Sequence, residues 1–394
     1  MPKINPSDIV RVNAHLHTPY SFSAFDSIAQ ALDMAADEHV KVVGINDFYT
    51  TDGYAEWKQE CAKRRLFPLY NIEFISLQAE DQAAGIRVND PNNPGRTYVS
   101  GKGLCNPAAL TEPYKAQFES VKNESNLHVE KMCAKLNGIL QEVRAGFALD
   151  ANEIKANLTK GSLRERHLAK ALRIAVYETT NGNPAKIAEL LERIFGGKPL
   201  KSDQNNHAAV ENEIRNNLLK AGGGAFVPED PKAFLPLTDV CQIILNAGGI
   251  PTYPFLADDA NGDFTDFEQD VEKAAETLRK RGIHSVEFIT TRNSIEVLEK
   301  YAGYLHDNHF VVTFGSEHNT PVVEPVELKA RGGVPLTEQL MRINYEGACV
   351  VAAHQDKVAQ GQSGYVDKNG QADPARRQGF IEYGNALIQR TIKG

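Results

Sequence analysis

The residues with the clearest chemical potential are two histidines, His15 and His17, at the end of an apolar, β-branched segment. In a β-strand, successive side chains alternate between the two faces, so both imidazoles project to the same side. Two imidazoles side by side at a strand end can bind one divalent metal ion. The simpler alternative is an amphipathic strand with two half-exposed histidines, and only partners from other segments can decide between the two.

Acidic and histidine residues recur at the ends of later predicted strands. Hydrophobic patterns predict strands at residues 9–16, 40–45, 66–77, 250–253, 283–289 and 310–314. The ends of the strands after the first carry Asp47, Glu73, Tyr253, Glu287, Glu317 and His318. In parallel α/β barrels the active site forms at the carboxyl ends of the strands. Carboxylates and imidazoles that converge there suit a metal centre, and a pair of ions could activate water and hold a phosphoryl oxygen.

The segments around these strands predict an α/β fold that is interrupted by an insertion. Helical patterns at 27–39 and 54–65 alternate with the first three strands, as in parallel βαβ units. Residues 80–115 are rich in Gly, Pro and Asn and predict a long loop or hairpin, and only helical patterns follow up to residue 220. We therefore predict a barrel from residues 1–79 and 236–330, a mostly helical cap inserted at 80–235, and a helical C-terminal extension at 331–394.

Composition narrows the classes of partner. A chain of 394 residues with 42% hydrophobic and 24% charged residues is ordinary for a soluble globular protein. The formal net charge of −8 argues against a nucleic-acid partner and favours a small-molecule substrate. Five separated cysteines without a CxxC pair indicate reduced thiols in a cytoplasmic protein. We expect no signal peptide and no membrane span, and self-association through the C-terminal extension is a further expectation.

The order of these motifs resembles the PHP family, named for polymerase and histidinol phosphatase domains. Its members are metal-dependent phosphoesterases on a distorted (β/α)7 barrel. The HxH motif of the family corresponds to residues 15–17, its Thr-Asp-His motif to residues 46–48 and its glutamate ligand to Glu73. A Gly-Gly-x-x-x-x-His-Pro motif corresponds to residues 248–254, and a Gly-Ser-Asp-x-His motif to residues 315–318. The resemblance implies a distorted, TIM-like (β/α)7 barrel with metal ligands at the strand ends.

A helical insertion is typical of one branch of that family, which removes phosphate from nucleotide ends and small nucleotides. Its insertion contains an Arg-His-x-Ala-x-x-Leu helix and then an aromatic-Val-Pro turn, to which residues 166–172 and 226–228 correspond. In that branch the insertion caps the barrel and helps to hold the substrate phosphate. The resemblance therefore implies that Arg166 and His167 bind phosphate. Lys102, in a Gly-Lys-Gly segment, and Arg292 are further candidates for substrate binding.

Several ligand positions depart from the family pattern. Phe48 replaces the histidine of the second motif, Tyr253 replaces the histidine of His-Pro, and Glu317 replaces the aspartate of the last motif. Because phenylalanine cannot bind a metal, we do not expect an intact three-ion centre. The resemblance implies one or two divalent ions of the Mn, Zn or Fe class. The predicted ligands are His15, His17, Glu73, Glu317 and His318.

Three residues are predicted to act in catalysis. His318 and Asp47 are candidates for moving a proton to the leaving oxygen, Asp47 could instead orient a ligand, and Tyr253 takes the place of the missing histidine. The predicted function is a metal-dependent hydrolase, a phosphoesterase acting on a small phosphorylated metabolite or nucleotide through metal-activated water. Two alternatives stay open: a hydrolase or lyase of the same fold acting on a non-phosphorylated metabolite, and a non-catalytic binding protein with a degenerate metal site.

Overall fold

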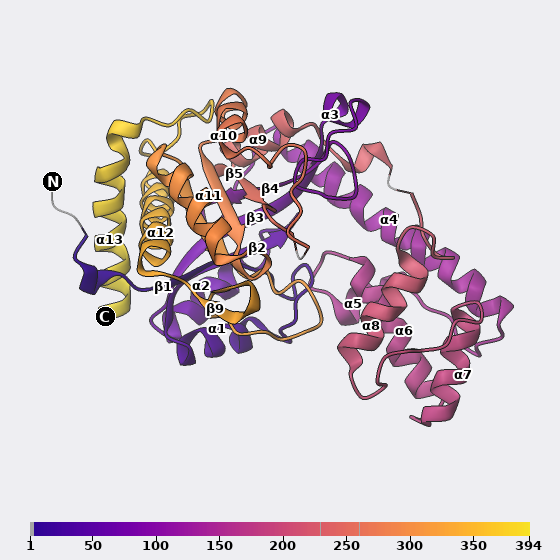
Figure 1. The fold of residues 1–394 in the computed structure, drawn as a ribbon. Helices are drawn as coiled ribbons and strands as arrows, with labels where there is room; N and C mark the ends of the chain where they lie inside the picture. Colours follow the sequence, from indigo (N-terminus) through magenta and orange to yellow (C-terminus); the bar gives the residue numbers. More distant parts are fainter. Residues whose placement is uncertain (1–3, 229, 260) are drawn as a thin grey trace.

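Seven strands form one sheet that curves into a nearly closed barrel (Figure 1). The computed structural model describes residues 4–228, 230–259 and 261–394. Strands neighbour one another in chain order: β1 (Arg11–Leu16), β2 (Val40–Phe48), β3 (Phe67–Leu77), β4 (Arg96–Lys102), β5 (Ile250–Phe255), β6 (Ser285–Ile289) and β7 (Val311–Gly315). The ends of the sheet meet, because the His17 N–H donates to the Glu317 carbonyl over 2.8 Å and the Glu317 N–H donates to the His15 carbonyl over 3.0 Å. The predicted α/β class with a TIM-like barrel is confirmed.

Where the sequence predicts a loop or a hairpin, at residues 80–115, the structure agrees with the hairpin through strand β4. It pairs antiparallel with β3 and with β5, whereas the other neighbours in the barrel pair parallel. The strand is short, and Gly-, Pro- and Asn-rich segments around it hide its pattern. An antiparallel strand needs no long crossover helix, and only the short α3 (Ala79–Ala83) precedes it. The range predicted as the inserted cap therefore includes one strand of the barrel.

Helices cover the outer face of the barrel. They are α1 (Ile28–Asp37), α2 (Tyr54–Lys63), α9 (Leu237–Asn246), α10 (Val271–Lys280) and α11 (Ile295–Asp307). Each buries an apolar stripe in the largest hydrophobic core. In α1, for example, the Ser27 side chain caps the helix by accepting a hydrogen bond from the Gln30 N–H, and Ile28, Leu32 and Ala35 are buried on one face.

Two long helices follow the barrel near its first and last strands. After a small hairpin of β8 (Lys329–Ala330) and β9 (Val334–Pro335), α12 (Glu338–Ala359) packs against β1 and β7, and α13 (Arg377–Lys393) packs against α12 (Figure 1). Their apolar side chains form a separate core with Val42, Leu69, Ile250 and Val311 of the strands. The predicted C-terminal extension at 331–394 is thus helical, and its helices pack on the barrel itself.

The crossing of α12 and α13 predicts a stability effect at Gly384. A Cβ atom at this position would lie 1.9 Å from the Cys349 carbonyl oxygen, which is backbone and cannot move aside. Gly384→Ala is therefore expected to lower the free energy of unfolding by about 3 kcal/mol, the upper range for overpacking. Gly379→Ala on the same helix meets nothing within 4 Å and should be neutral or slightly stabilising. Urea unfolding of both variants checks the prediction, and equal effects would contradict it.

Residues between β4 and α9 form a helical cap beside the barrel (Figure 1). Its helices are α4 (Tyr114–Glu142), α5 (Ala151–Leu158), α6 (Glu165–Thr179), α7 (Pro184–Ile194) and α8 (His207–Ile214), which continues as a π-helical turn over Arg215–Leu219. The cap has its own hydrophobic core, with Leu136, Leu172 and Leu191, whereas Val121 of α4 belongs to the barrel core. The helices predicted up to residue 220 are confirmed. In the described part of the chain, no helix combines the length and apolarity that crossing a bilayer requires.

Polar side chains fill part of the barrel interior. Lys102 on β4 places its Nζ atom 3.1 Å from the Ala14 carbonyl oxygen on β1, 3.2 Å from Asn46 Oδ1 on β2 and 2.6 Å from Glu287 Oε2 on β6. Because β4 neighbours none of these strands, the contacts cross the interior. The side chains of Lys102, Asn46 and Glu287 are fully buried. Buried charges are costly unless they are paired, and Lys102 and Glu287 meet this requirement by pairing with each other.

Candidate metal centre and its cavity

Three buried ligand atoms converge at the ends of β1 and β3. The two Nε2 atoms of His15 and His17 lie 3.2 Å apart, and Glu73 Oε2 lies 3.6 Å from the first and 3.1 Å from the second. In the described part of the chain, these three residues form the one His, Cys, Asp or Glu cluster with metal-ligand spacing. The structure thus brings together three of the five predicted ligands.

A carboxylate from β6 orients His15. Glu287 Oε2 lies 3.0 Å from His15 Nδ1, and Glu287 Oε1 accepts a hydrogen bond from the Ser100 hydroxyl. Burial disfavours the charged imidazole, but the Glu287 and Glu73 carboxylates outweigh it and raise the pKa of His15 to about 9. A carboxylate at Nδ1 favours a proton on that atom, so binding of a metal ion would displace the second proton, from Nε2, and that atom would present its lone pair to the cluster.

A hydroxyl relay orients His17. The Ser21 hydroxyl donates to Asp47 Oδ1 over 2.6 Å. The Ser21 oxygen lies 3.2 Å from His17 Nδ1 and can accept a hydrogen bond from the N–H of that atom. Asp47 also accepts the Thr18 N–H over 2.8 Å and the Thr18 hydroxyl over 2.5 Å. The Phe48 ring stacks on the imidazole with centroids 5.2 Å apart. These contacts fix the ring so that Nε2 of His17 also faces the cluster.

The cluster fits a divalent cation. Glu73 Oε2 is buried, and no hydrogen bond with acceptable geometry satisfies it. Burial opposes the charge on Glu73, yet the two histidines outweigh it and lower the pKa of the carboxyl to about 2. Two imidazole nitrogens and one carboxylate oxygen around a common point are a typical ligand set for Zn²⁺, Mn²⁺ or Fe²⁺. A cation at that point would satisfy the orphaned oxygen.

Glu317 and His318, the other two predicted ligands, lie outside the cluster although their backbone adjoins His15. The Glu317 carboxylate pairs with the Arg292 guanidinium at 2.5 Å. The His318 Nδ1 atom lies 2.9 Å from the Ser316 hydroxyl, its Nε2 atom lies 2.8 Å from the Glu324 carbonyl, and its ring stacks on Phe25. Both residues have positive φ angles, 66° and 60°, so the chain turns away from the direction of β7. Strand alternation no longer predicts where such side chains point.

The predicted catalytic residues Asp47, His318 and Tyr253 do not line the cavity described below. Asp47 and His318 are bound to protein groups as above, which leaves Asp47 as the residue behind His17. Tyr253 is buried in the layer between the sheet and the outer helices, where its hydroxyl donates to Glu268 over 2.7 Å. Its neighbour Thr252 faces the other way, toward Ser285. The structure therefore places Tyr253 on the face of β5 opposite to the barrel interior.

The partner of Tyr253 predicts a pH dependence of stability. Burial raises the pKa of Glu268 to about 8, although three donors hydrogen bond to it. Between about pH 4.5 and 8 the folded state then holds a proton that the unfolded state releases, so stability falls as the pH rises, by up to about 1.4 kcal/mol per unit. Glu268→Gln cannot ionise, and its stability relative to wild type should increase toward pH 8. Urea unfolding at several pH values measures this difference, and parallel curves would contradict it.

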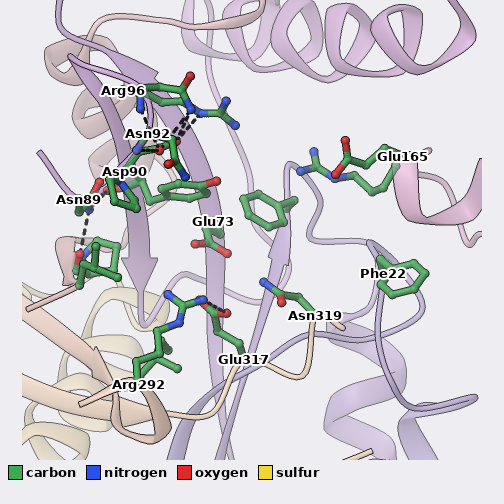
Figure 2. Close-up of a pocket in the computed structure, with 18 of the residues that line it drawn as sticks. Phe22, Glu73, Asn89, Asp90, Asn92, Arg96, Glu165, Arg292, Glu317 and Asn319 are labelled. Atoms are coloured by element: carbon green, nitrogen blue, oxygen red, sulfur yellow. Dashed lines mark hydrogen bonds and ion pairs between the residues drawn. The ribbon is translucent and has the colours of Figure 1, made fainter. Parts of the chain in front are cut away.

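A cavity of about 370 Å³ lies over the cluster, with Glu73 in its wall. Figure 2 shows Glu73 facing the same space as the Arg292–Glu317 pair, with Glu165 of the cap across from it. Segments of the barrel, of the loop before β4 and of the cap all contribute to the lining. Its basic side chains are Arg96, Arg164, Arg166, Arg215, Lys220 and Arg292, and its acidic side chains are Glu73, Asp90, Glu165 and Glu317.

Most of these cations have a carboxylate partner. Asp90 pairs with Arg96 at 3.3 Å, Glu165 pairs with Arg215 and, at 3.0 Å, with Lys220, and Glu317 pairs with Arg292. Among the described residues, Arg164 and Arg166 have no carboxylate within ion-pair distance. The Arg164 guanidinium lies over the Phe48 ring at 4.4 Å, and Arg166 donates to Asn212 over 3.1 Å. Burial lowers the pKa of Arg166 to about 10, which leaves it charged at neutral pH.

The predicted substrate-binding residues separate into two groups. Arg166 and Arg292 line the cavity. His167 and Lys102 do not: the His167 ring accepts the Arg164 N–H over 3.0 Å, and burial lowers its pKa to about 3, so it stays neutral. Lys102 lies on β4 inside the barrel and not in an exposed loop. Sequence reasoning missed Arg164, Arg215 and Lys220, because only the fold brings these cap residues next to Glu73.

The fold and the site together define an α/β barrel with a His-His-Glu cluster beneath an arginine-lined cavity. A scan against models of known protein families finds no match, and a search of curated proteins finds none either. Among solved structures, an amidohydrolase from Chromobacterium violaceum with bound sulfate and no metal is similar in fold, with a TM-score of 0.52 and 15% identity over 85% of this chain and 96% of that chain. A presumed metal-dependent phosphoesterase from Bifidobacterium adolescentis has a TM-score of 0.52 and 15% identity over 84% and 94% of the two chains. These likenesses support the barrel fold.

Proposed function

We propose that the chain is a metal-dependent phosphoesterase that acts on a small phosphorylated metabolite or nucleotide. The observation that carries the proposal is one cavity lined both by Glu73 of the His-His-Glu cluster and by the carboxylate-free guanidinium groups of Arg164 and Arg166. A site for a cation and a site for an anion thus adjoin, as phosphoryl transfer to water requires. The cavity volume of about 370 Å³ suits a small molecule.

Each residue has a defined part in this proposal. His15, His17 and Glu73 would hold the ion, which when bound would supply a Lewis acid for the activation of water and the polarisation of a phosphoryl group. Glu287 and Ser21 keep the two imidazoles in the binding orientation. Arg164 and Arg166 bind the phosphoryl oxygens through charge-assisted hydrogen bonds. The Phe48 ring holds the Arg164 guanidinium in place through a cation–π contact.

The descriptions of the two structural neighbours support a hydrolase in general, since one is called an amidohydrolase and holds sulfate without metal. The other is called a presumed metal-dependent phosphoesterase, which is the class proposed here. The resemblance to the PHP family, a cytoplasmic location and self-association stay predictions. A second candidate follows from the same arginines, because guanidinium groups bind carboxylates as well as phosphates. In that case the chain is a hydrolase or lyase acting on a carboxylate-bearing, non-phosphorylated metabolite.

One panel of assays tests both candidates. The purified chain is stripped of metal, reloaded with Mn²⁺, Zn²⁺ or Fe²⁺, and given phosphomonoesters and phosphodiesters of sugars and nucleotides beside carboxylate-bearing esters, amides and lactones. Release of inorganic phosphate or of a phosphomonoester supports the phosphoesterase. Metal-dependent turnover of the non-phosphorylated compounds alone supports the second candidate. No turnover with any ion, together with metal bound below one equivalent, would leave only a non-catalytic binding protein.

A further inference from the structure

The other carboxylates and the remaining imidazole near the metal cluster already have protein partners. Asp47 accepts three hydrogen bonds from Thr18 and Ser21, and both ring nitrogens of His318 are engaged as described above. Glu317 pairs with Arg292. A second metal ion would need at least one of these groups or Glu287. Among the described residues near the cluster, Glu287 is the best-placed carboxylate for a second ion, because it contacts His15, a ligand of the first ion, directly.

Glu287 is held by Lys102, whose ammonium group stands deep in the barrel. The Lys102 side chain is fully buried, and its Nζ atom contacts three oxygen atoms: Glu287 Oε2 at 2.6 Å, the Ala14 carbonyl at 3.1 Å and Asn46 Oδ1 at 3.2 Å. An ammonium group has three donors, so these three acceptors satisfy it completely.

The oxygen atoms around this ammonium group resemble the surroundings of a hard divalent cation. A carboxylate, an amide oxygen and a backbone carbonyl are the ligands that Mn²⁺ and Mg²⁺ prefer. Glu287 distributes its lone pairs among Lys102, His15 and the Ser100 hydroxyl. The Lys102 ammonium group thus occupies the position from which a second metal ion would bind the Glu287 carboxylate. Repulsion between two cations in this enclosed space would keep the second ion out.

We propose that Lys102 limits the centre to a single metal ion by occupying Glu287 as a built-in cation. This inference rests on the proposed function, because it presupposes a first ion at His15, His17 and Glu73. Lys102 is a positioning residue: it acts through Glu287, which it reserves for the Nδ1 atom of His15. The chain therefore differs from hydrolases that bind a pair of ions, in which a carboxylate bridges two metals.

Counting bound Mn²⁺ tests the proposal. The stripped chain is equilibrated with Mn²⁺, freed of excess by gel filtration and measured by elemental analysis, and the Mn²⁺ electron paramagnetic resonance spectrum is recorded. Wild type is expected to hold one equivalent with the six-line spectrum of an isolated ion. Lys102→Ala vacates an oxygen-lined space beside Glu287, and a second equivalent with the spectrum of a coupled pair is expected. Lys102→Ala/Glu287→Gln should lose that second equivalent.

The control is Lys122→Ala, which removes a lysine paired with Asp52 at the surface and should leave one equivalent bound. Two equivalents in wild type, or one equivalent in a folded Lys102→Ala variant, would overturn the proposal while leaving the phosphoesterase intact. No bound Mn²⁺ in wild type would overturn both. If Lys102→Ala does not fold, the wild-type spectrum alone decides, because a coupled pair there refutes the role of Lys102 and an isolated ion supports it.

Discussion

Replacing Glu73 with glutamine is expected to remove the bound metal ion and, with it, turnover. Glu73 supplies the one negatively charged ligand of the cluster, and glutamine has nearly the same shape without the charge. Loss of a residue that merely orients a ligand costs roughly 10- to 100-fold in metal affinity, and loss of this ligand should exceed that. Competition with a fluorescent chelator measures the affinity. Because ligand at about 100 times its Kd adds about 2.7 kcal/mol to stability, Mn²⁺ should also raise the Tm of wild type and not of the variant.

The matched control is Glu80→Gln on α3, which changes an exposed glutamate away from the cavity. Its metal affinity and its response of Tm to Mn²⁺ should equal those of wild type. If Glu73→Gln binds Mn²⁺ as tightly as wild type does, the His-His-Glu cluster is not a metal centre. If both variants lose the metal, the effect comes from overall charge and not from the cluster.

The double substitution Arg164→Gln/Arg166→Gln should lower kcat/KM for a phosphorylated substrate by about 10²- to 10⁴-fold. Each hydrogen bond to a charged group contributes about 1.5–3 kcal/mol, and 1.36 kcal/mol corresponds to a factor of ten. Metal affinity should stay unchanged, because neither arginine contacts the cluster. Steady-state kinetics beside the Mn²⁺ titration separate the two effects. Substitution of Arg215, which Glu165 already neutralises, should cost less.

Lys170→Gln is the control for this experiment, since Lys170 lies on the same helix, α6, but does not line the cavity. It should preserve kcat/KM. Unchanged kinetics in the double variant would mean that the phosphate is bound elsewhere in the cavity. A loss of similar size for carboxylate-bearing substrates alone would instead favour the second candidate function.

The His-His-Glu cluster could be predicted from the sequence because the regular geometry of strands determines where its side chains point. His15 and His17 share one face at the end of β1, Glu73 lies on the parallel strand β3, and the barrel brings them together. The polar partners of the histidines were partly visible too, since Asp47 and Glu287 were among the residues predicted at strand ends. Asp47 lies near the end of β2, and Glu287 is the middle residue of β6. Local alternation and chain order therefore suffice where a residue belongs to a regular strand.

The prediction was less accurate where the chain leaves regular structure, and where a shift of one residue along a strand decides which face a side chain points to. Tyr253 faces outward because the interior face of β5 belongs to Thr252, a difference of one residue. Lys102 was assigned to a loop because the short antiparallel strand that carries it was not recognised. Arg164 comes from the cap and contacts Phe48 only through the tertiary fold, so no local pattern could indicate it.

The reversed direction of β4 also explains the length of α4. Lys102 at the end of β4 pairs with Ile250 at the beginning of β5, so the chain leaves β4 at the end of the barrel opposite to the cavity. The cap residues Arg164 and Arg166 must nevertheless reach the cavity at the other end. The 29 residues of α4 span about 43 Å at 1.5 Å per residue, enough to carry the polypeptide along the full height of the barrel. The antiparallel direction of β4 thus sets the length that α4 needs. A helix shorter by a few turns would leave Arg164 and Arg166 out of reach of the cavity.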